Sequence, residues 1–314
     1  MGRWKIDWRW GEGDLPLVSC PGLIGKCEFT SNHSRLNESE ILLFCMRDRI
    51  VWPPYRLSHH KWVFGMTECP VYTYVNVARL QGLFNLTMTY TRTATVPWVY
   101  GSCKRLSPTD KPTYNASRNY AAGKKHLVAW FVGHCRTSSR REVYAAALAE
   151  HIDVHKYGCG GGYSCPRWDN RRCHSVLLNN DYKFYLSFEN SLCRDYATEK
   201  IWQILEINVV PIVLGYANNT DLFPPHSVID VRDFASPRHL ADYLKELDAN
   251  DTLYNEYFRW RAEYWCSEAA HNNGCNICRH ALAMRGRREV VKDLVAEWGR
   301  KENCARPNNY YRGM

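Results

Sequence analysis

The chain has 314 residues, of which 45% are hydrophobic and 23% are charged, and its formal net charge is +9. This length allows a large core and two domains, and the composition excludes general disorder. The 41 basic residues are scattered along the chain, which disfavours a nucleic-acid-binding protein.

Apolar runs and turn residues predict the elements in chain order. The aromatic-rich first part is expected to form strands at 41–44 and 62–66, followed by a linker at 102–122. After the linker we expect a strand at 126–132, a helix at 140–152, strands at 151–157 and 183–188, a helix at 198–207, a strand at 209–214 and a helix at 238–247. The basic group at 285–292 is expected on the solvated face of a further, amphipathic helix.

The alternation of strands and helices after the linker predicts a doubly wound parallel sheet. Ligands of such sheets lie at the carboxyl ends of the strands, where the helices begin. Ser236 and Pro237 form a good start for one of these helices, because serine caps a helix and proline fits its first turn.

Two of the strand-to-helix junctions carry polar residues suited to an anionic ligand. After a loop that begins at Gly133, Arg140 and Arg141 open a helix, a place where cations are unfavourable unless an anion binds there. At the other junction Glu199 and Lys200 open a helix, so that the lysine could face a phosphate and the carboxylate could hold ribose hydroxyls. Ordinary exposed residues of a first helical turn are the alternative at both junctions.

Cysteines and glycosylation sequons indicate the compartment. Fourteen cysteines are unusual in a reducing cytosol. Asn-x-Ser/Thr sequons, in excess of chance, begin at Asn32, Asn37, Asn85, Asn115, Asn218 and Asn250. Together they favour an oxidising lumen. No apolar run reaches the ~18–20 residues of a membrane span, and the first residues lack the apolar region of a signal peptide, so we expect an N-terminal anchor that this chain lacks.

Cys275 and Cys278 form a Cys-x-x-Cys pair between His271 and His280, which resembles a small zinc cluster. No second cysteine pair follows at zinc-finger spacing, and no thioredoxin-like unit surrounds the motif as a redox pair would require. The zinc and redox interpretations are therefore the weaker ones, and disulfides are the stronger.

One block of the sequence is similar to a known family. The segment YKFYLSFENSLCRDYATEKIW at 182–202, with VPIVLG at 210–215 and YFRW at 257–260, closely resembles the α1,3-fucosyltransferases of glycosyltransferase family 10. KWVFGMTECP at 61–70 and LFNLTMTY at 83–90 resemble further segments of that family, so that the similarity extends over about residues 40–280. Cys159, Cys165, Cys173 and Cys193, with GCGGGYSCPR at 158–167, resemble its invertebrate branch, which includes enzymes acting on the innermost GlcNAc of N-glycans.

The resemblance implies an α/β fold of the GT-B class, with two Rossmann-like domains and the active site in the cleft between them. We expect an acceptor-side domain at 1–120, a GDP-fucose-binding domain at 121–285 and a C-terminal helix and tail at 286–314. The resemblance also implies disulfides at the Cys-x-x-Cys pair, with Cys20 and Cys27 as candidate partners and the pairing left open.

The resemblance assigns roles residue by residue. Glu68 matches the general base of the family. The residues that match its donor-binding positions are Arg141 and Lys200 for the diphosphate, Tyr196 beside them, Glu199 for the ribose, and Tyr185 and Asn190 for the nucleotide. The β linkage of the donor and the α linkage of the product in this family imply one inverting displacement, in which a carboxylate takes the proton of the acceptor hydroxyl and the cations stabilise the leaving GDP. No metal is strictly required, although stimulation by Mn²⁺ occurs in the family.

The expected reaction is transfer of fucose from GDP-fucose to the 3-hydroxyl of GlcNAc in glycans, in the Golgi lumen, by an enzyme whose full-length form is a single-pass type II membrane protein. The leading acceptor is the core GlcNAc of N-glycans, and antennal Lewis-type GlcNAc is the alternative. Two departures from the family motivate another reading, a weakly active homologue that binds glycans. Thr91–Thr95 replaces Arg-Arg-Asp-Ser-Asp, and Gly133 and His134 replace a Ser-Asn pair.

Overall fold

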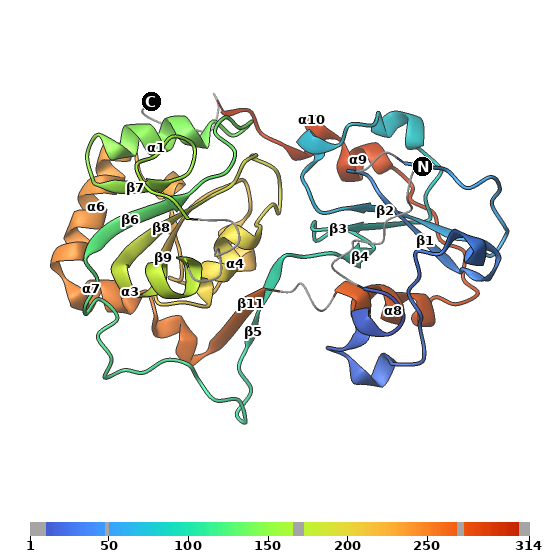
Figure 1. The fold of residues 1–314 in the computed structure, drawn as a ribbon, viewed down its shortest axis with the longest axis horizontal. Helices are drawn as coiled ribbons and strands as arrows, with labels where there is room; N and C mark the ends of the chain where they lie inside the picture. Colours follow the sequence, from blue (N-terminus) through green and yellow to red (C-terminus); the bar gives the residue numbers. More distant parts are fainter. Residues whose placement is uncertain (1–10, 48–49, 166–172, 269–272, 308–314) are drawn as a thin grey trace. The chain divides into compact units, whose positions relative to one another are not determined.

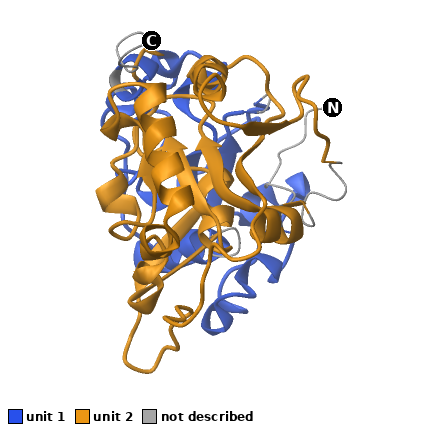
Figure 2. Ribbon diagram, turned by 90° about the vertical axis from the view of Figure 1, so that its left-hand side faces the viewer, with its two compact units in different colours: residues 1–100, 269–304 blue, residues 101–268, 305–314 orange. Residues whose placement is uncertain are grey.

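The computed structural model describes residues 11–47, 50–165, 173–268 and 273–307. The chain divides into two compact units (Figure 2). Unit 1 comprises residues 1–100 and 269–304, and unit 2 comprises residues 101–268 and 305–314. Each unit is built on its own parallel sheet with helices around it, and this confirms the predicted α/β class.

Unit 1 contains a four-stranded sheet in the order β1-β2-β3-β4, all parallel (Figure 1). Its strands are β1 (Ile41–Cys45), β2 (Lys61–Met66), β3 (Leu86–Thr89) and β4 (Val96–Pro97). The unit's helices are α8 (Asn273–Ala283), α9 (Leu294–Trp298) and α10 (Arg300–Asn303). Short 3-10 turns in this unit include η3 (His33–Glu38) and η5 (Val77–Leu80). The strands at 41–44 and 62–66 are thus confirmed, and every residue of β2 and β3 is buried.

Unit 2 contains a five-stranded parallel sheet in the order β10-β9-β8-β6-β7. Its strands are β6 (His126–Phe131), β7 (Val154–Tyr157), β8 (Tyr182–Phe188), β9 (Val210–Leu214) and β10 (Ile229–Asp230). Its helices are α1 (Arg141–Ala149), α3 (Asn179–Asp181), α4 (Glu199–Leu205), α5 (Asn219–Leu222), α6 (Pro237–Ala249) and α7 (Asp251–Glu256). The predicted alternation of strand and helix is confirmed.

Both faces of the unit 2 sheet are covered, as a doubly wound sheet requires. One core joins β6, β8 and β9 to α1 and α6, and includes the fully buried Leu148 and Leu244. Another core, on the residues that alternate with these, includes Tyr185 and the fully buried Ile204 of α4. Side chains on both faces of β8 are therefore buried, which explains its continuous apolar run. The predicted start of α6 is also confirmed, since Ser236 Oγ accepts a hydrogen bond from His239 N–H and Pro237 follows it.

Part of the segment expected as a linker is a strand instead. β5 (Gly101–Arg105) pairs antiparallel with β11 (Tyr264–Glu268), and a disulfide joins Cys103 to Cys266 across the pair. The segment carries no apolar run, because a disulfide and a distant partner strand hold it in place. Any side chain at residue 101 would collide with the Trp202 ring, whose nearest atom lies 2.1 Å from the position of a Cβ, so that only glycine fits there.

The pairing of β5 with β11 also sets the limits of unit 2, at residues 101 and 268. These limits differ from the sequence expectation, which divided the chain at residues 120 and 285. Residues of the expected tail at 286–314 belong largely to unit 1. Trp298 is only 1% exposed there, and its Nε1–H donates a hydrogen bond to Thr73 Oγ1 (2.8 Å).

The amphipathic helix expected over the basic group at 285–292 is wrong. Helix α8 ends at Ala283, and the chain leaves the helical conformation at Gly286, whose φ is +74°. Glycine ends helices readily in this left-handed conformation. Arg285 instead lies 3.6 Å from the Glu40 carboxylate.

Disulfides join Cys20 to Cys275 and Cys27 to Cys278, so the expected role of these four cysteines is confirmed. Residue 271, a proposed zinc ligand, lies outside the described residues. The bonds connect positions 255 and 251 residues apart, and so remove much conformational freedom from the unfolded chain.

Other cysteines form disulfides within unit 2, Cys135 with Cys159 and Cys165 with Cys173. In the parts of the chain that the structure describes, no helix has the length and apolar character of a membrane span.

A partly buried lysine of unit 2 makes stability depend on pH. Lys124 Nζ donates to the carbonyl oxygens of Asn179 (2.8 Å) and Tyr182 (2.7 Å), and burial lowers its pKa to about 7. In the unfolded chain a lysine titrates near 10.4, so between about pH 7 and 10 the unfolded state binds the extra proton. The free energy of unfolding should therefore rise with pH in this window, by up to about 1.4 kcal/mol per unit.

Lys124→Met should remove this slope between about pH 7 and 9 in urea unfolding, whatever its effect on stability at a single pH. An equal slope in the wild type and the variant would contradict the assignment.

Candidate functional site

The candidate site lies at the carboxyl edge of the unit 2 sheet, where the strand order reverses between β6 and β8. Loops that leave two adjacent parallel strands in opposite directions open a crevice at such a point, and doubly wound sheets bind their ligands there. Here the two loops are hydrogen-bonded to each other. Ser139 N–H donates to the Asn190 carbonyl (3.0 Å), and Ser139 Oγ donates to the Glu189 carbonyl (2.7 Å). The two polar junctions singled out in the sequence are therefore neighbours in space.

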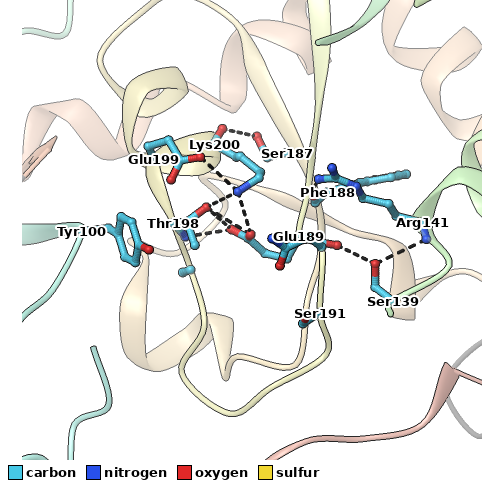
Figure 3. Close-up of polar contacts among 12 residues, drawn as sticks. Tyr100, Ser139, Arg141, Ser187, Phe188, Glu189, Ser191, Thr198, Glu199 and Lys200 are labelled. Carbon is cyan, nitrogen blue, oxygen red and sulfur yellow. Dashed lines mark hydrogen bonds and ion pairs between the residues drawn. The ribbon is translucent and has the colours of Figure 1, made fainter. Parts of the chain in front are cut away.

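Arg141 is a buried cation at this edge (Figure 3). It is the first residue of α1 and 3% exposed, and one Nη–H of its guanidinium donates to the Phe188 carbonyl (2.5 Å). The guanidinium also lies 5.9 Å from the centre of the Trp130 ring. Among the described residues it forms no ion pair with a carboxylate, and its Nε–H has no hydrogen-bond partner. A buried charge without a counter-ion is costly, so this position fits an anion supplied by a ligand.

Lys200 is a second cation at the same edge, and two carboxylates hold it. Its Nζ lies 3.1 Å from Glu189 Oε2 and 3.1 Å from Glu199 Oε1, and it donates to Thr198 Oγ1 (2.6 Å). Burial alone would lower the pKa of Lys200, but the two carboxylates outweigh burial and raise it. Arg141 acts against this rise, so the two cations are close enough to repel each other. Lys200 is therefore charged at neutral pH, beside the uncompensated Arg141.

Glu189 organises the start of α4. Its carboxylate accepts hydrogen bonds from Thr198 N–H (2.7 Å) and Thr198 Oγ (2.9 Å) as well as pairing with Lys200 (Figure 3). Burial raises the pKa of Glu189, against the effect of Lys200. The resemblance to the family assigns no role to Glu189. The signal that could have found it is the carboxylate itself, at the end of an otherwise apolar buried strand.

The remaining expected donor residues lie around this edge. Tyr185 on β8 is 2% exposed, and burial raises the pKa of its phenol, against the effects of Lys200 and Arg141. Asn190 follows β8, and its Oδ1 is buried with no hydrogen-bond partner among the described residues. Tyr196 is 1% exposed in the loop before α4. Glu199, the first residue of α4, keeps 44% of its side chain exposed and so remains available to solvent or ligand.

Glu68, the expected general base, belongs to unit 1. It follows β2 at the carboxyl edge of that parallel sheet, and 18% of its side chain is exposed. Its Oε1 accepts a hydrogen bond from an Nη–H of Arg47 (2.7 Å), which follows β1. Threonine hydroxyls at the end of β3 and in the Thr91–Thr95 segment form a hydrogen-bonded network, in which the hydroxyls of Thr89 and Thr91 are 2.9 Å apart and both side chains are buried.

A doubly wound α/β unit with a buried cation at its switch point, which has no carboxylate partner among the described residues, has the arrangement typical of proteins that bind phosphorylated ligands. Comparison with known proteins narrows this class. Residues 121–298 match the family described as "Glycosyltransferase family 10 (fucosyltransferase) C-term", and residues 4–101 match "Fucosyltransferase, N-terminal".

Relatives come from several animals. The chain is 35% identical to Alpha-(1,3)-fucosyltransferase C of Drosophila melanogaster, over 94% of this chain and 74% of that protein. It is 30% identical to Alpha-(1,3)-fucosyltransferase fut-1 of Caenorhabditis elegans, over 96% of this chain and 70% of that protein. Glycoprotein 3-alpha-L-fucosyltransferase A of Drosophila melanogaster is 35% identical, over 87% of this chain and 55% of that protein.

Among solved structures, an α1,3-fucosyltransferase with GDP-fucose aligns with a TM-score of 0.48 and 18% identity, over 70% of this chain and 69% of that one. The family matches and the identities above establish the relationship without it. The chain belongs to glycosyltransferase family 10, the fucosyltransferases, and is a glycosyltransferase.

Replacing Arg141 or Lys200 with a neutral residue should change the free energy of unfolding of the ligand-free protein by different amounts. Arg141→Met removes a charge that has no carboxylate partner, so the free energy of unfolding should change by less than about 1 kcal/mol or rise. Lys200→Met should cost about 2–3 kcal/mol, because it leaves Glu189 buried without its cation. Urea unfolding of both variants measures the difference.

The cost of Lys200→Met should shrink at acidic pH, where a protonated Glu189 no longer needs a counter-ion. Equal costs for the two variants at neutral pH would contradict this account of the site.

Proposed function

We propose that this protein transfers L-fucose from GDP-fucose to the 3-hydroxyl of GlcNAc in glycoprotein glycans, with inversion at the anomeric carbon. The observation that carries the proposal is the buried guanidinium of Arg141, which has no carboxylate partner among the described residues and lies at the switch point of the sheet. A nucleoside diphosphate would supply the missing negative charge there. Family membership makes a nucleotide sugar the natural choice of ligand.

In the proposed donor complex Arg141 and Lys200 neutralise the diphosphate, and Tyr196 donates to it. Lys200 lies between Glu189 and Glu199, so it needs to turn only from Glu199 toward the phosphate, while Glu189 keeps it in place. This movement releases the exposed carboxylate of Glu199 to accept hydrogen bonds from the ribose hydroxyls. Buried Tyr185 and the buried amide oxygen of Asn190 position the nucleotide.

In the proposed chemical step, the Glu68 carboxylate removes the proton of the GlcNAc hydroxyl as its oxygen attacks the anomeric carbon of fucose. The bond from that carbon to the diphosphate breaks on the opposite face, and GDP leaves with the bonding electron pair. Arg141 and Lys200 stabilise the negative charge that grows on GDP. We propose that these fixed cations do the work of a divalent ion, so that no metal is required and Mn²⁺ at most stimulates transfer.

We propose the core GlcNAc of N-glycans as the leading acceptor. The sequence at 158–167 and one relative named a glycoprotein 3-α-L-fucosyltransferase support this choice. Antennal GlcNAc is the alternative, supported by a relative from Mus musculus, 33% identical over 88% of this chain and 76% of that protein, named a 4-galactosyl-N-acetylglucosaminide 3-α-L-fucosyltransferase 9. We place the reaction in the Golgi lumen, since the disulfides require an oxidising compartment.

A second candidate function is glycan binding with weak catalysis. The network of threonine hydroxyls at Thr89–Thr95, where two acidic residues and one basic residue of the family are missing, favours it. GDP-fucose hydrolysis with and without a GlcNAc acceptor separates the two functions. GDP binding without turnover on any GlcNAc-bearing acceptor would favour the glycan-binding homologue.

A substitution at Glu68 should lower the rate of transfer, whereas a substitution at Lys200 should weaken GDP binding. Glu68→Gln should lower the rate of transfer by about 10²–10⁴-fold, because the general base is lost, and should leave GDP affinity nearly unchanged. Lys200→Ala should weaken GDP binding by about 10–100-fold, because one charge-assisted contact is lost. Initial rates and calorimetric titration with GDP measure the two effects. Retained activity in Glu68→Gln would remove that residue from the mechanism.

Acceptor choice can be mapped directly. Incubation with GDP-fucose and two N-glycans, with and without free antennal galactose, should add fucose to the core GlcNAc of both. Mass spectrometry of the products identifies the modified sugar. Fucose found only on antennal GlcNAc would establish the alternative acceptor.

Chelation tests the role of the fixed cations. Transfer should persist in excess EDTA, because Arg141 and Lys200 carry the positive charge that the leaving GDP needs. An enzyme that loses all activity in EDTA and recovers it with Mn²⁺ would contradict the proposal.

A further inference from the structure

Unit 1 contains a cavity of about 330 Å³ that plays no part in the proposed donor or base chemistry. Residues of the segment 26–43 and of α8 line it, and the disulfide from Cys27 to Cys278 crosses its wall. Its volume is at the small end of the ~300–1,000 Å³ range of ligand pockets. A single sugar ring or a group of similar size would fit it.

The lining of the cavity combines apolar and polar side chains. Its apolar part includes Phe29, Ile41, Leu43 and Leu282, which remain only partly buried. In its polar part, Arg35 donates two hydrogen bonds to the carboxylate of Glu28 (2.6 and 3.0 Å) and one to that of Glu38 (3.0 Å). These ion pairs add hydrogen-bond donors and acceptors to the apolar residues of the lining. A pyranose has the complementary form, with an apolar face of C–H groups and a rim of hydroxyls.

Asn32 is on the lining of this cavity and begins a sequon, Asn32-His33-Ser34. It is exposed, its Oδ1 accepts hydrogen bonds from Ser34 Oγ (2.8 Å) and Ser34 N–H (3.0 Å), and its Nδ2 makes no hydrogen bond to the described residues. The nitrogen that would carry an N-linked sugar is therefore available at the cavity edge.

At the sequon of Asn85, by contrast, the side-chain amide is already hydrogen-bonded within the fold. Its Nδ2 donates to the Glu289 carbonyl (2.8 Å), its Oδ1 accepts from Trp62 N–H (2.8 Å), and Thr87 is 2% exposed. A sugar on Asn85 would break these hydrogen bonds. The folded protein can therefore carry a glycan on Asn32 but not on Asn85.

We propose that Asn32 carries an N-linked glycan and that the first N-acetylglucosamine of this glycan packs into the cavity as a structural part of unit 1. A free monosaccharide would bind such a small site weakly. Attachment at the rim converts binding into an intramolecular event, with an effective concentration in the millimolar range or higher, which is enough to fill a weak site. The proposal rests on passage through an oxidising lumen, which the disulfides support, and is independent of transferase activity.

The test uses the full chain secreted behind an added signal peptide, from cells that retain high-mannose glycans. Mass spectrometry of glycopeptides should find Asn32 occupied and Asn85 unmodified. Endoglycosidase H, which leaves one GlcNAc on the asparagine, should not change the melting temperature. Complete removal by peptide N-glycosidase F, and the neutral variant Asn32→Gln, should each lower it by about 2–4 °C.

Asn115 provides the matched control, because it is an exposed sequon in unit 2 with the same 2.8 Å contact from the serine hydroxyl to Oδ1. Asn115→Gln should shift the melting temperature by less than about 1 °C. Amide exchange at 277–282 should be unchanged by endoglycosidase H and faster in Asn32→Gln. An unmodified Asn32, or the same melting temperature with one GlcNAc and with none, would overturn the proposal.

Discussion

The buried guanidinium of Arg141, which has no carboxylate partner among the described residues, is the constraint on which the candidate site depends. The parallel sheet of unit 2 reverses its strand order between β6 and β8, and the helices that follow these strands start at the same edge. The fold thereby brings Arg141 and Lys200 together, although their mutual repulsion is unfavourable. Glu189 and Glu199 hold Lys200, whereas Arg141 has no carboxylate partner among the described residues. The free protein therefore tolerates an energetic cost that an anionic ligand would relieve.

Unit 1 is built on a smaller, four-stranded sheet. Its strands follow one another without a reversal, and disulfides between the segment 20–27 and α8 hold distant parts of the chain together. Glu68 follows the fully buried β2 at the carboxyl edge of this sheet, and Arg47 donates a hydrogen bond to its carboxylate. A base that must accept one proton from an acceptor hydroxyl benefits from such a well-held position. The proposed glycan at Asn32 would be a further covalent reinforcement of unit 1, in addition to its disulfides.

Much of the fold and part of the site could be predicted from the sequence. Strands such as β8 are visible because burial on both faces demands an unbroken apolar run. The polar segment Gly101–Arg105 gave no such signal, since its partner strand and its disulfide come 163 residues later. The helix expected at 285–292 was wrong because charge spacing alone does not reveal the turn at Gly286. Arg141 and Lys200 were found through their unfavourable places at helix starts, whereas the role of Glu189 depends on contacts across a loop.

The central claim is that the buried guanidinium of Arg141 binds the diphosphate of the donor. Calorimetric titration with guanosine, GMP and GDP tests it most directly, on the wild type and on Arg141→Met. In the wild type each added phosphate should strengthen binding, with GDP about 10–100-fold tighter than GMP. In Arg141→Met this gain should largely vanish while guanosine binding stays the same. A variant that keeps the full preference for GDP would contradict the claim.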